Sequence, residues 1–189
     1  MGCNLSDSAC LTPSRVAQPS HGQRSLWFLH HLAPEGGAYN IAAAARVRSP
    51  VDADALERAL QALVDRHGAL RTTFSADAGE PCRRVAEHLS FTLGREDAAG
   101  WSEARLRSRL ADEAWRPFDL GNGPLLRVTL FTGAPGGPVL LVVIHHIIAD
   151  FWSLAILMRE LPALYREADL ASPGLSYDEH VRLEREALS

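Results

Sequence analysis

The segment 139–144 constrains the fold more than any other part of this 189-residue chain. It is an unbroken run of valine, leucine and isoleucine, a composition typical of a strand that is buried on both faces. Such a strand needs other elements packed on both sides, so the run predicts a layered domain built on a central sheet. His145 and His146 follow the run directly and are expected at the carboxyl end of this strand.

Helical spacing of apolar residues recurs along the rest of the chain. Ser20 is placed to cap the first helix, Asp52 or Asp54 the second, and Pro117 ends the third. A helix also follows Asp150, with leucines at helical spacing. The predicted helices cover residues 20–32, 52–67, 101–115, a stretch that starts after 150 and ends before 172, and 177–188.

Strand patterns alternate with these helices. Residues 70–75 and 82–86 favour a hairpin, because β-branched and aromatic residues flank a turn that contains Gly79. Further strands are expected at 41–47, 124–131 and 138–144. The alternation indicates an α/β class, or an α+β sandwich, with an ordered domain from about Ser20 and an unstructured segment at 1–19.

Composition excludes several classes of function. The chain is 47% hydrophobic and 22% charged, as in soluble globular domains, with a net charge of -4. Its arginines form no basic stripe, so nucleic acid is not an expected partner, and no apolar run is long enough to span a membrane. The three cysteines, Cys3, Cys10 and Cys82, show no CxxC spacing, and we expect a reducing cytoplasm.

The segment 145–150 places two imidazoles and the Asp150 carboxylate on a tight loop between a strand and a helix. Imidazole titrates near neutrality, so a fixed histidine can accept a proton or donate a hydrogen bond to developing charge. Adjacent residues of an extended chain point in opposite directions, so His145 and His146 are poorly placed to share a metal ion. A single histidine beside an apolar strand is, however, more often a core residue than a catalytic one.

Four segments together resemble the condensation domains of nonribosomal peptide synthetases. The segment 145–150 is similar to the His-His-x-x-x-Asp-Gly motif of that family and of related carrier-dependent acyltransferases. Residues 20–29, SHGQRSLWFL, resemble the first condensation motif, and residues 66–74, RHGALRTTF, resemble the second. Residues 118–127 are similar to a stretch that precedes the histidine strand in these domains.

The resemblance implies a fold of the chloramphenicol acetyltransferase type, with a mixed sheet and helices packed on it. Condensation domains have two such lobes, and this chain is about the size of one. Residues 20–175 are then the amino-terminal lobe, and 176–189 a helix leading toward a carboxyl-terminal lobe that the chain lacks. Because the family's active site lies between the lobes, we expect no turnover by this chain alone.

The resemblance also implies the chemistry. An amine on an acceptor carrier protein attacks the thioester of a donor carrier protein, both held on 4′-phosphopantetheine arms, and the domain binds no cofactor of its own. By resemblance His146 is the catalytic residue of this acyltransferase. The resemblance implies structural support from four further residues, His145, Asp150, Arg66 and Arg71. Either arginine can pair with Asp150 or remain a solvated or capping group. The carboxyl-terminal lobe and an adjacent adenylation domain are the other expected partners.

One position departs from the motif, because Phe151 stands where the family has glycine, before Trp152 and Ser153. In the family the active site is a tunnel between the two lobes. If position 151 faces this tunnel, these three residues line the tunnel and the Phe151 ring narrows it. Alternatively, Phe151 turns into the core. The departure keeps other functions open. These are a non-catalytic module that docks carrier proteins, and an ester-forming or epimerising relative of the same fold.

Overall fold

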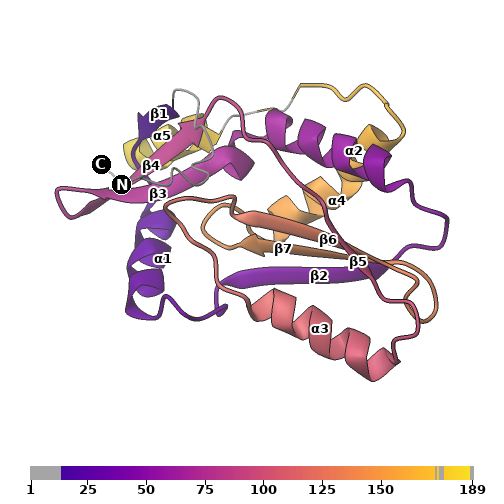
Figure 1. The fold of residues 1–189 in the computed structure, drawn as a ribbon. Helices are drawn as coiled ribbons and strands as arrows, with labels where there is room; N and C mark the ends of the chain where they lie inside the picture. Colours follow the sequence, from indigo (N-terminus) through magenta and orange to yellow (C-terminus); the bar gives the residue numbers. More distant parts are fainter. Residues whose placement is uncertain (1–13, 173, 175–176, 188–189) are drawn as a thin grey trace, which may run out of the picture.

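The central sheet runs through the middle of the molecule (Figure 1). The computed structural model describes residues 14–172, 174 and 177–187. Within them, four strands form this sheet in the order β2-β7-β6-β5. Strand β5 pairs with β6 in parallel, and the other neighbours are antiparallel, so the predicted mixed sheet is confirmed. The strands are β2 (Asn40–Arg46), β5 (Gly94–Asp97), β6 (Leu126–Thr132) and β7 (Val139–His145).

Strand β7 is the buried strand that the sequence predicted. It pairs along its length with β2 on one side and β6 on the other. Helices α2 (Ala53–Arg66) and α4 (Phe151–Tyr165) lie on one side of the sheet, and α3 (Glu103–Trp115) lies on the other (Figure 1). Both faces of β7 are therefore covered, which explains its continuous apolar composition.

A second, three-stranded sheet lies beside the first in the order β1-β4-β3. The hairpin of β3 (Thr72–Asp77) and β4 (Glu80–Ala86) was predicted, although its first strand begins later than expected. The preceding residues form a 3-10 turn, η1 (Gly68–Arg71). Helices α1 (His21–Leu32) and α5 (Tyr177–Ala187) lie next to this sheet (Figure 1).

The start of the ordered chain was predicted too late. Strand β1 (Ser14–Ala17) pairs antiparallel with β4, six residues before the expected beginning at Ser20. Residues 1–13, the rest of the segment predicted to be unstructured, lie outside the described part, as does residue 188 at the end of the last predicted helix. Strand β5 was also missed, because its sequence, Gly-Arg-Glu-Asp, carries no apolar alternation.

Local capping signals were predictive. Ser20 caps α1 through a reciprocal pair of bonds with Gln23, each 3.1 Å long, and Asp52 caps α2. Helix α2 buries an apolar stripe, Leu56, Leu60, Leu63 and Val64, and packs against α4. Along the described chain, none of these helices combines the length and apolar character that crossing a membrane requires.

Candidate active site

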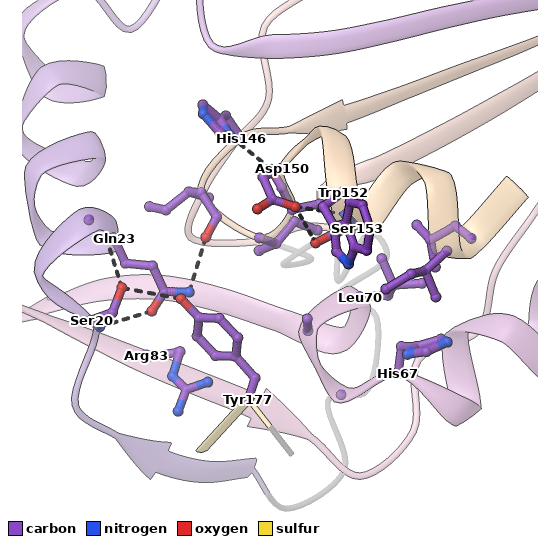
Figure 2. Close-up of a pocket in the computed structure, with 18 of the residues that line it drawn as sticks. Ser20, Gln23, His67, Leu70, Arg83, His146, Asp150, Trp152, Ser153 and Tyr177 are labelled. Atoms are coloured by element: carbon purple, nitrogen blue, oxygen red, sulfur yellow. Dashed lines mark hydrogen bonds between the residues drawn. The ribbon is translucent and has the colours of Figure 1, made fainter. Parts of the chain in front are cut away.

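The loop 146–150 joins β7 to α4 and forms part of the wall of a cavity of about 950 Å³. The other walls come from the start of α1, the last residue of α2, η1, β4, the first two turns of α4 and the first residue of α5 (Figure 2). Two of the sequence segments that resemble condensation motifs, 20–29 and 66–74, therefore contribute to the same cavity as the histidine loop. The tertiary fold thus brings the histidine loop together with segments that lie more than 70 residues before it in the sequence.

His145 belongs to the core. Its side chain leaves the end of β7 toward the interior, where the residue is 2% exposed. Its Nδ1 accepts a hydrogen bond from the backbone N–H of Ile147 at 3.1 Å, and its ring lies edge-on to those of His30 and Phe118. Burial lowers the pKa of His145 to about 4, helped by the positive charge that His30 and His146 can carry. His145 is therefore neutral near pH 7 and fixes the shape of the loop.

His146 is exposed, unlike His145, and lines the cavity (Figure 2). Its backbone N–H donates to the carbonyl of Tyr39 at 2.8 Å, which holds the end of the strand. Its ring Nδ1 lies 2.8 Å from the carbonyl oxygen of Ala149. A carbonyl oxygen only accepts, so Nδ1 carries the proton, and in the neutral ring Nε2 keeps its lone pair. Nε2 has no hydrogen-bond partner in the described chain, so it is available to accept a proton from a bound group.

Asp150 caps helix α4, and no arginine among the described side chains pairs with it. Its carboxylate accepts from the backbone N–H and from the hydroxyl of Ser153, both at 2.7 Å. The bond from the Ser153 hydroxyl, followed by the bond from its N–H, lowers the pKa of Asp150. Of the two alternatives for Arg66 and Arg71, the ion pair with Asp150 is not found among the described residues, because the N–H and hydroxyl of Ser153 satisfy this carboxylate.

Arg66 and Arg71 make other contacts. Arg66 Nε lies 3.0 Å from Glu160 Oε2, which His67 Nε2 also contacts at 2.7 Å, and this cluster ties α2 to α4. Burial opposes ionisation of Glu160, but the bond from His67 and the charges of His67 and Arg66 lower its pKa.

The guanidinium of Arg71 donates to backbone carbonyls, among them Val64 at 3.1 Å and Glu87 at 2.9 Å. These bonds join the end of α2 to the chain after β4. Both arginines therefore support the frame of the cavity, and neither contacts the histidine loop in the described structure.

Two of the three residues after Asp150 line the cavity. They are Trp152 and Ser153, both labelled in Figure 2, whereas Phe151 is not among the lining residues. The side chains of Phe151 and Trp152 project outward, with the residues 75% and 78% exposed. The alternative that Phe151 turns into the core is therefore wrong.

Sequence reasoning assigned no role to Gln23, whose carboxamide contacts the histidine loop. It also missed Arg83 and Tyr177, which lie together on the cavity wall with the guanidinium carbon 5.2 Å from the ring centre. The signal for Gln23 was its place three residues after Ser20, in a capping box. No sequence signal pointed to the other two. In the described chain, no three His, Cys, Asp or Glu side chains gather as metal ligands would.

Comparison with known proteins decides the family. The model of the condensation domain family matches residues 14–189. The chain belongs to the condensation domain family. A linear gramicidin synthase of Brevibacillus parabrevis is 38% identical over 179 residues, which are 89% of this chain and 2% of that protein. The family is that of nonribosomal peptide synthetases, which make antibiotics and other secondary metabolites.

Solved condensation domains share the fold of this condensation-family chain. The first condensation domain of the CDA synthetase superposes with a TM-score of 0.82 at 22% identity, over 94% of this chain and 47% of that one. A chain from the complex of the X-domain and OxyB from teicoplanin biosynthesis gives 0.82 at 28% identity, over 100% of this chain and 41% of that one. The chain thus spans less than half of each solved chain and a small fraction of the synthase.

Proposed function

We propose that this chain is the first half of a condensation domain that forms an amide between two carrier-bound substrates. The family supports the reaction class, acyl transfer from a thioester. The length supports the division into halves, since the chain covers 47% of a solved condensation domain. Both substrates arrive on phosphopantetheine arms of carrier protein domains, and an adjacent adenylation domain activates one of them.

The geometry of His146 carries the proposal. In the reaction the acceptor amine attacks the donor carbonyl, the new C–N bond forms and the C–S bond breaks. The amine loses a proton and the departing thiolate gains one. Nε2 of His146 can accept a hydrogen bond from the amine, because the bond from Nδ1 to Ala149 leaves it unprotonated. Because a thioester is already activated, orienting the amine contributes much of the rate.

The remaining half completes the site. Two exposed aromatic rings follow the histidine loop: Trp152, which lines the cavity with His146, and its sequence neighbour Phe151, which does not. We propose that a second lobe covers this aromatic rim, Phe151 and Trp152, and closes the cavity. Substrate is then held against His146 only when both halves are present, so the chain alone forms no product.

Intact-mass spectrometry of acyl transfer between a loaded donor carrier and a loaded acceptor carrier tests this proposal. The full-length polypeptide that contains these residues is expected to form product, and His146→Ala should reduce the rate by more than about 100-fold. His31→Ala is the matched control, because the His31 ring also contacts a backbone carbonyl, that of Trp27 at 2.8 Å, but does not line the cavity. It should keep the rate.

Two results would contradict the proposal. One is product formation by the His146→Ala polypeptide at the unaltered rate. The other is turnover by the 189-residue chain alone at the rate of the full polypeptide, which would remove the need for a second half.

A second candidate is a binding module that docks a carrier or another protein without condensation. Phe151 in place of the motif glycine and the likeness to the complex of the X-domain and OxyB favour it. In that case the full polypeptide forms no product with its own carriers. His146→Ala then leaves the affinity for the carriers unchanged. Isothermal titration of both forms with the loaded carriers measures this.

A further inference from the structure

The carboxamide of Gln23 bridges helix α1 and the histidine loop. Its Nε2 donates to the carbonyl of Ile147 at 3.0 Å, across 124 residues of sequence. Its Oε1 accepts from the backbone N–H of Ser20 at 3.1 Å, which fixes the orientation of the amide group (Figure 2). The residue is 5% exposed, so water does not readily replace either bond.

The bond to Ile147 acts on the part of the loop that sets the tautomer of His146. Ile147 lies between His146 and Ala149, and the Nδ1 of His146 bonds to the Ala149 carbonyl. If the peptide group after Ile147 rotates, the Ala149 carbonyl moves away from the imidazole. The buried carbonyl of Ile147 needs a donor, and Gln23 supplies it from a rigid helix.

Helix α1 is itself fixed at this end. The Ser20 hydroxyl accepts from the Gln23 backbone N–H at 3.1 Å and from the hydroxyl of Tyr177, at the start of α5, at 3.2 Å. The side-chain amide of Gln23 therefore projects from an anchored helix end, which holds its Nε2 against the carbonyl of Ile147.

We propose that Gln23 is a positioning residue: through Ile147 it holds the loop in the shape in which His146 keeps its proton on Nδ1 and presents an unprotonated Nε2 to the cavity. The consequence for the rate rests on the proposed function, whereas the consequence for the tautomer does not. The two are measured separately.

The substitution Gln23→Glu isolates the bond. Glutamate has nearly the same shape, and its carboxylate still accepts from the Ser20 N–H, because glutamate at this helix position completes the same capping box. A negative charge in the first turn also suits the helix dipole. The second oxygen, however, faces the Ile147 carbonyl without a proton to donate, so only the link to the loop is lost.

Gln61 supplies a matched control. Its Oε1 accepts from the backbone N–H of Phe91 at 2.8 Å, and its Nε2 donates to the carbonyl of Leu89 at 3.0 Å and to Asp65 at 3.1 Å. It thus bridges a helix and a loop in the same way, away from the cavity. Gln61→Glu loses at least as many bonds as Gln23→Glu, so a general loss of stability should affect both variants.

The first measurement is the imidazole ¹⁵N spectrum of the 189-residue chain at about pH 8, where histidine is neutral. Comparison with His146→Ala assigns the signals of His146. The unaltered chain and Gln61→Glu should show the Nδ1–H form, with its two nitrogen signals far apart. In Gln23→Glu the two signals should move toward each other as the tautomers mix. Unchanged signals in Gln23→Glu would overturn the inference, whatever the rate does.

The second measurement is the rate of product formation by the full-length polypeptide. Gln23→Glu should lower kcat roughly 10- to 100-fold with little change in KM for the carriers, because it misplaces a reacting group and not a docking surface. Gln61→Glu should keep kcat. Equal losses in both variants would mean a structural role and overturn the inference. A changed tautomer with an unchanged rate would support the positioning by Gln23 and count against a catalytic His146.

Discussion

His145 and His146 are neighbours in sequence, but their side chains lie in different surroundings. Side chains alternate at the end of a strand, so one ring enters the core and the other faces the cavity. The buried ring serves as an acceptor for the backbone of its own loop, and burial disfavours its protonated form. The environment of each ring, and not its type, separates the buried histidine from the one that lines the cavity.

The buried histidine predicts a loss of stability in mild acid. In the unfolded chain His145 gains a proton as the pH falls through 6.5, but in the folded chain its pKa is about 4. The unfolded state therefore binds more protons in this window. The full stabilisation is present above pH 6.5, and the free energy of unfolding should fall by about 3 kcal/mol between there and pH 4. Urea unfolding at a series of pH values measures it.

His145→Asn is the control for that series, because its side-chain oxygen can still accept from the Ile147 N–H. Other groups titrate in both proteins, and the difference between the two curves isolates His145. The variant should be less stable at about pH 7 but should have a shallower dependence on pH. Parallel curves for the two proteins would contradict the assignment.

Helix α4 begins at the histidine loop, so its cap belongs to the frame of the site. The Asp150 carboxylate accepts from the backbone N–H of Ser153, one of the free N–H groups in the first turn of this helix. The family motif contains this aspartate, and the arrangement gives it a local reason: the carboxylate fixes where the loop stops and the helix starts.

Asp150 as a helix cap and Asp150 as an ion-pair partner lead to different predictions for the variant Asp150→Asn. As a cap, asparagine serves about as well as aspartate, so Asp150→Asn should change the free energy of unfolding by less than about 0.5 kcal/mol. Asp150→Ala removes the acceptor and should cost about 1 kcal/mol. Chemical denaturation of the three forms measures both values. An equal, large loss in both variants would indicate an ion pair instead.

At the scale of the whole molecule, the aromatic rim of Phe151 and Trp152 follows the histidine loop, and its second ring, Trp152, lines the cavity. Phe151 and Trp152 are among the most exposed large apolar residues of the described chain. Large apolar groups that gather at the edge of a cavity are typical of a surface that another element covers. The proposed second lobe is that element.

Substitution at the rim should separate stability from activity. Phe151→Ser with Trp152→Ser should change the free energy of unfolding of this chain by less than about 0.5 kcal/mol, because both rings face solvent. In the full-length polypeptide the same change should lower the rate by about tenfold or more, since buried aromatic anchors dominate interfaces. Calorimetry and the acyl-transfer assay measure the two quantities.

Leu32→Ser is the comparison for the rim variant. Leu32 ends α1, is 81% exposed and does not line the cavity, so it should affect neither quantity. If the rim variant likewise leaves the rate of the full polypeptide unchanged, the second lobe does not pack on Phe151 and Trp152.

Local patterns determined much of the fold. The continuous apolar run of β7, the leucine stripe of α2 and the capping residues Ser20 and Asp52 each act within a few residues, so the sequence alone predicted these elements. Strands β1 and β5 were missed because both are four residues long and carry little apolar pattern. Such strands form because a neighbouring strand offers unpaired backbone groups, and this information lies elsewhere in the chain.

The sequence by itself determined that a histidine pair ends a buried strand, and its motifs identified the family that comparison confirmed. Only the tertiary structure decided the partners of each polar group: Ser153 for Asp150, Glu160 for Arg66, and the Ile147 carbonyl for Gln23. The physical reason is that a backbone element follows from its own residues, whereas a hydrogen bond between distant segments depends on which elements the folded chain places side by side.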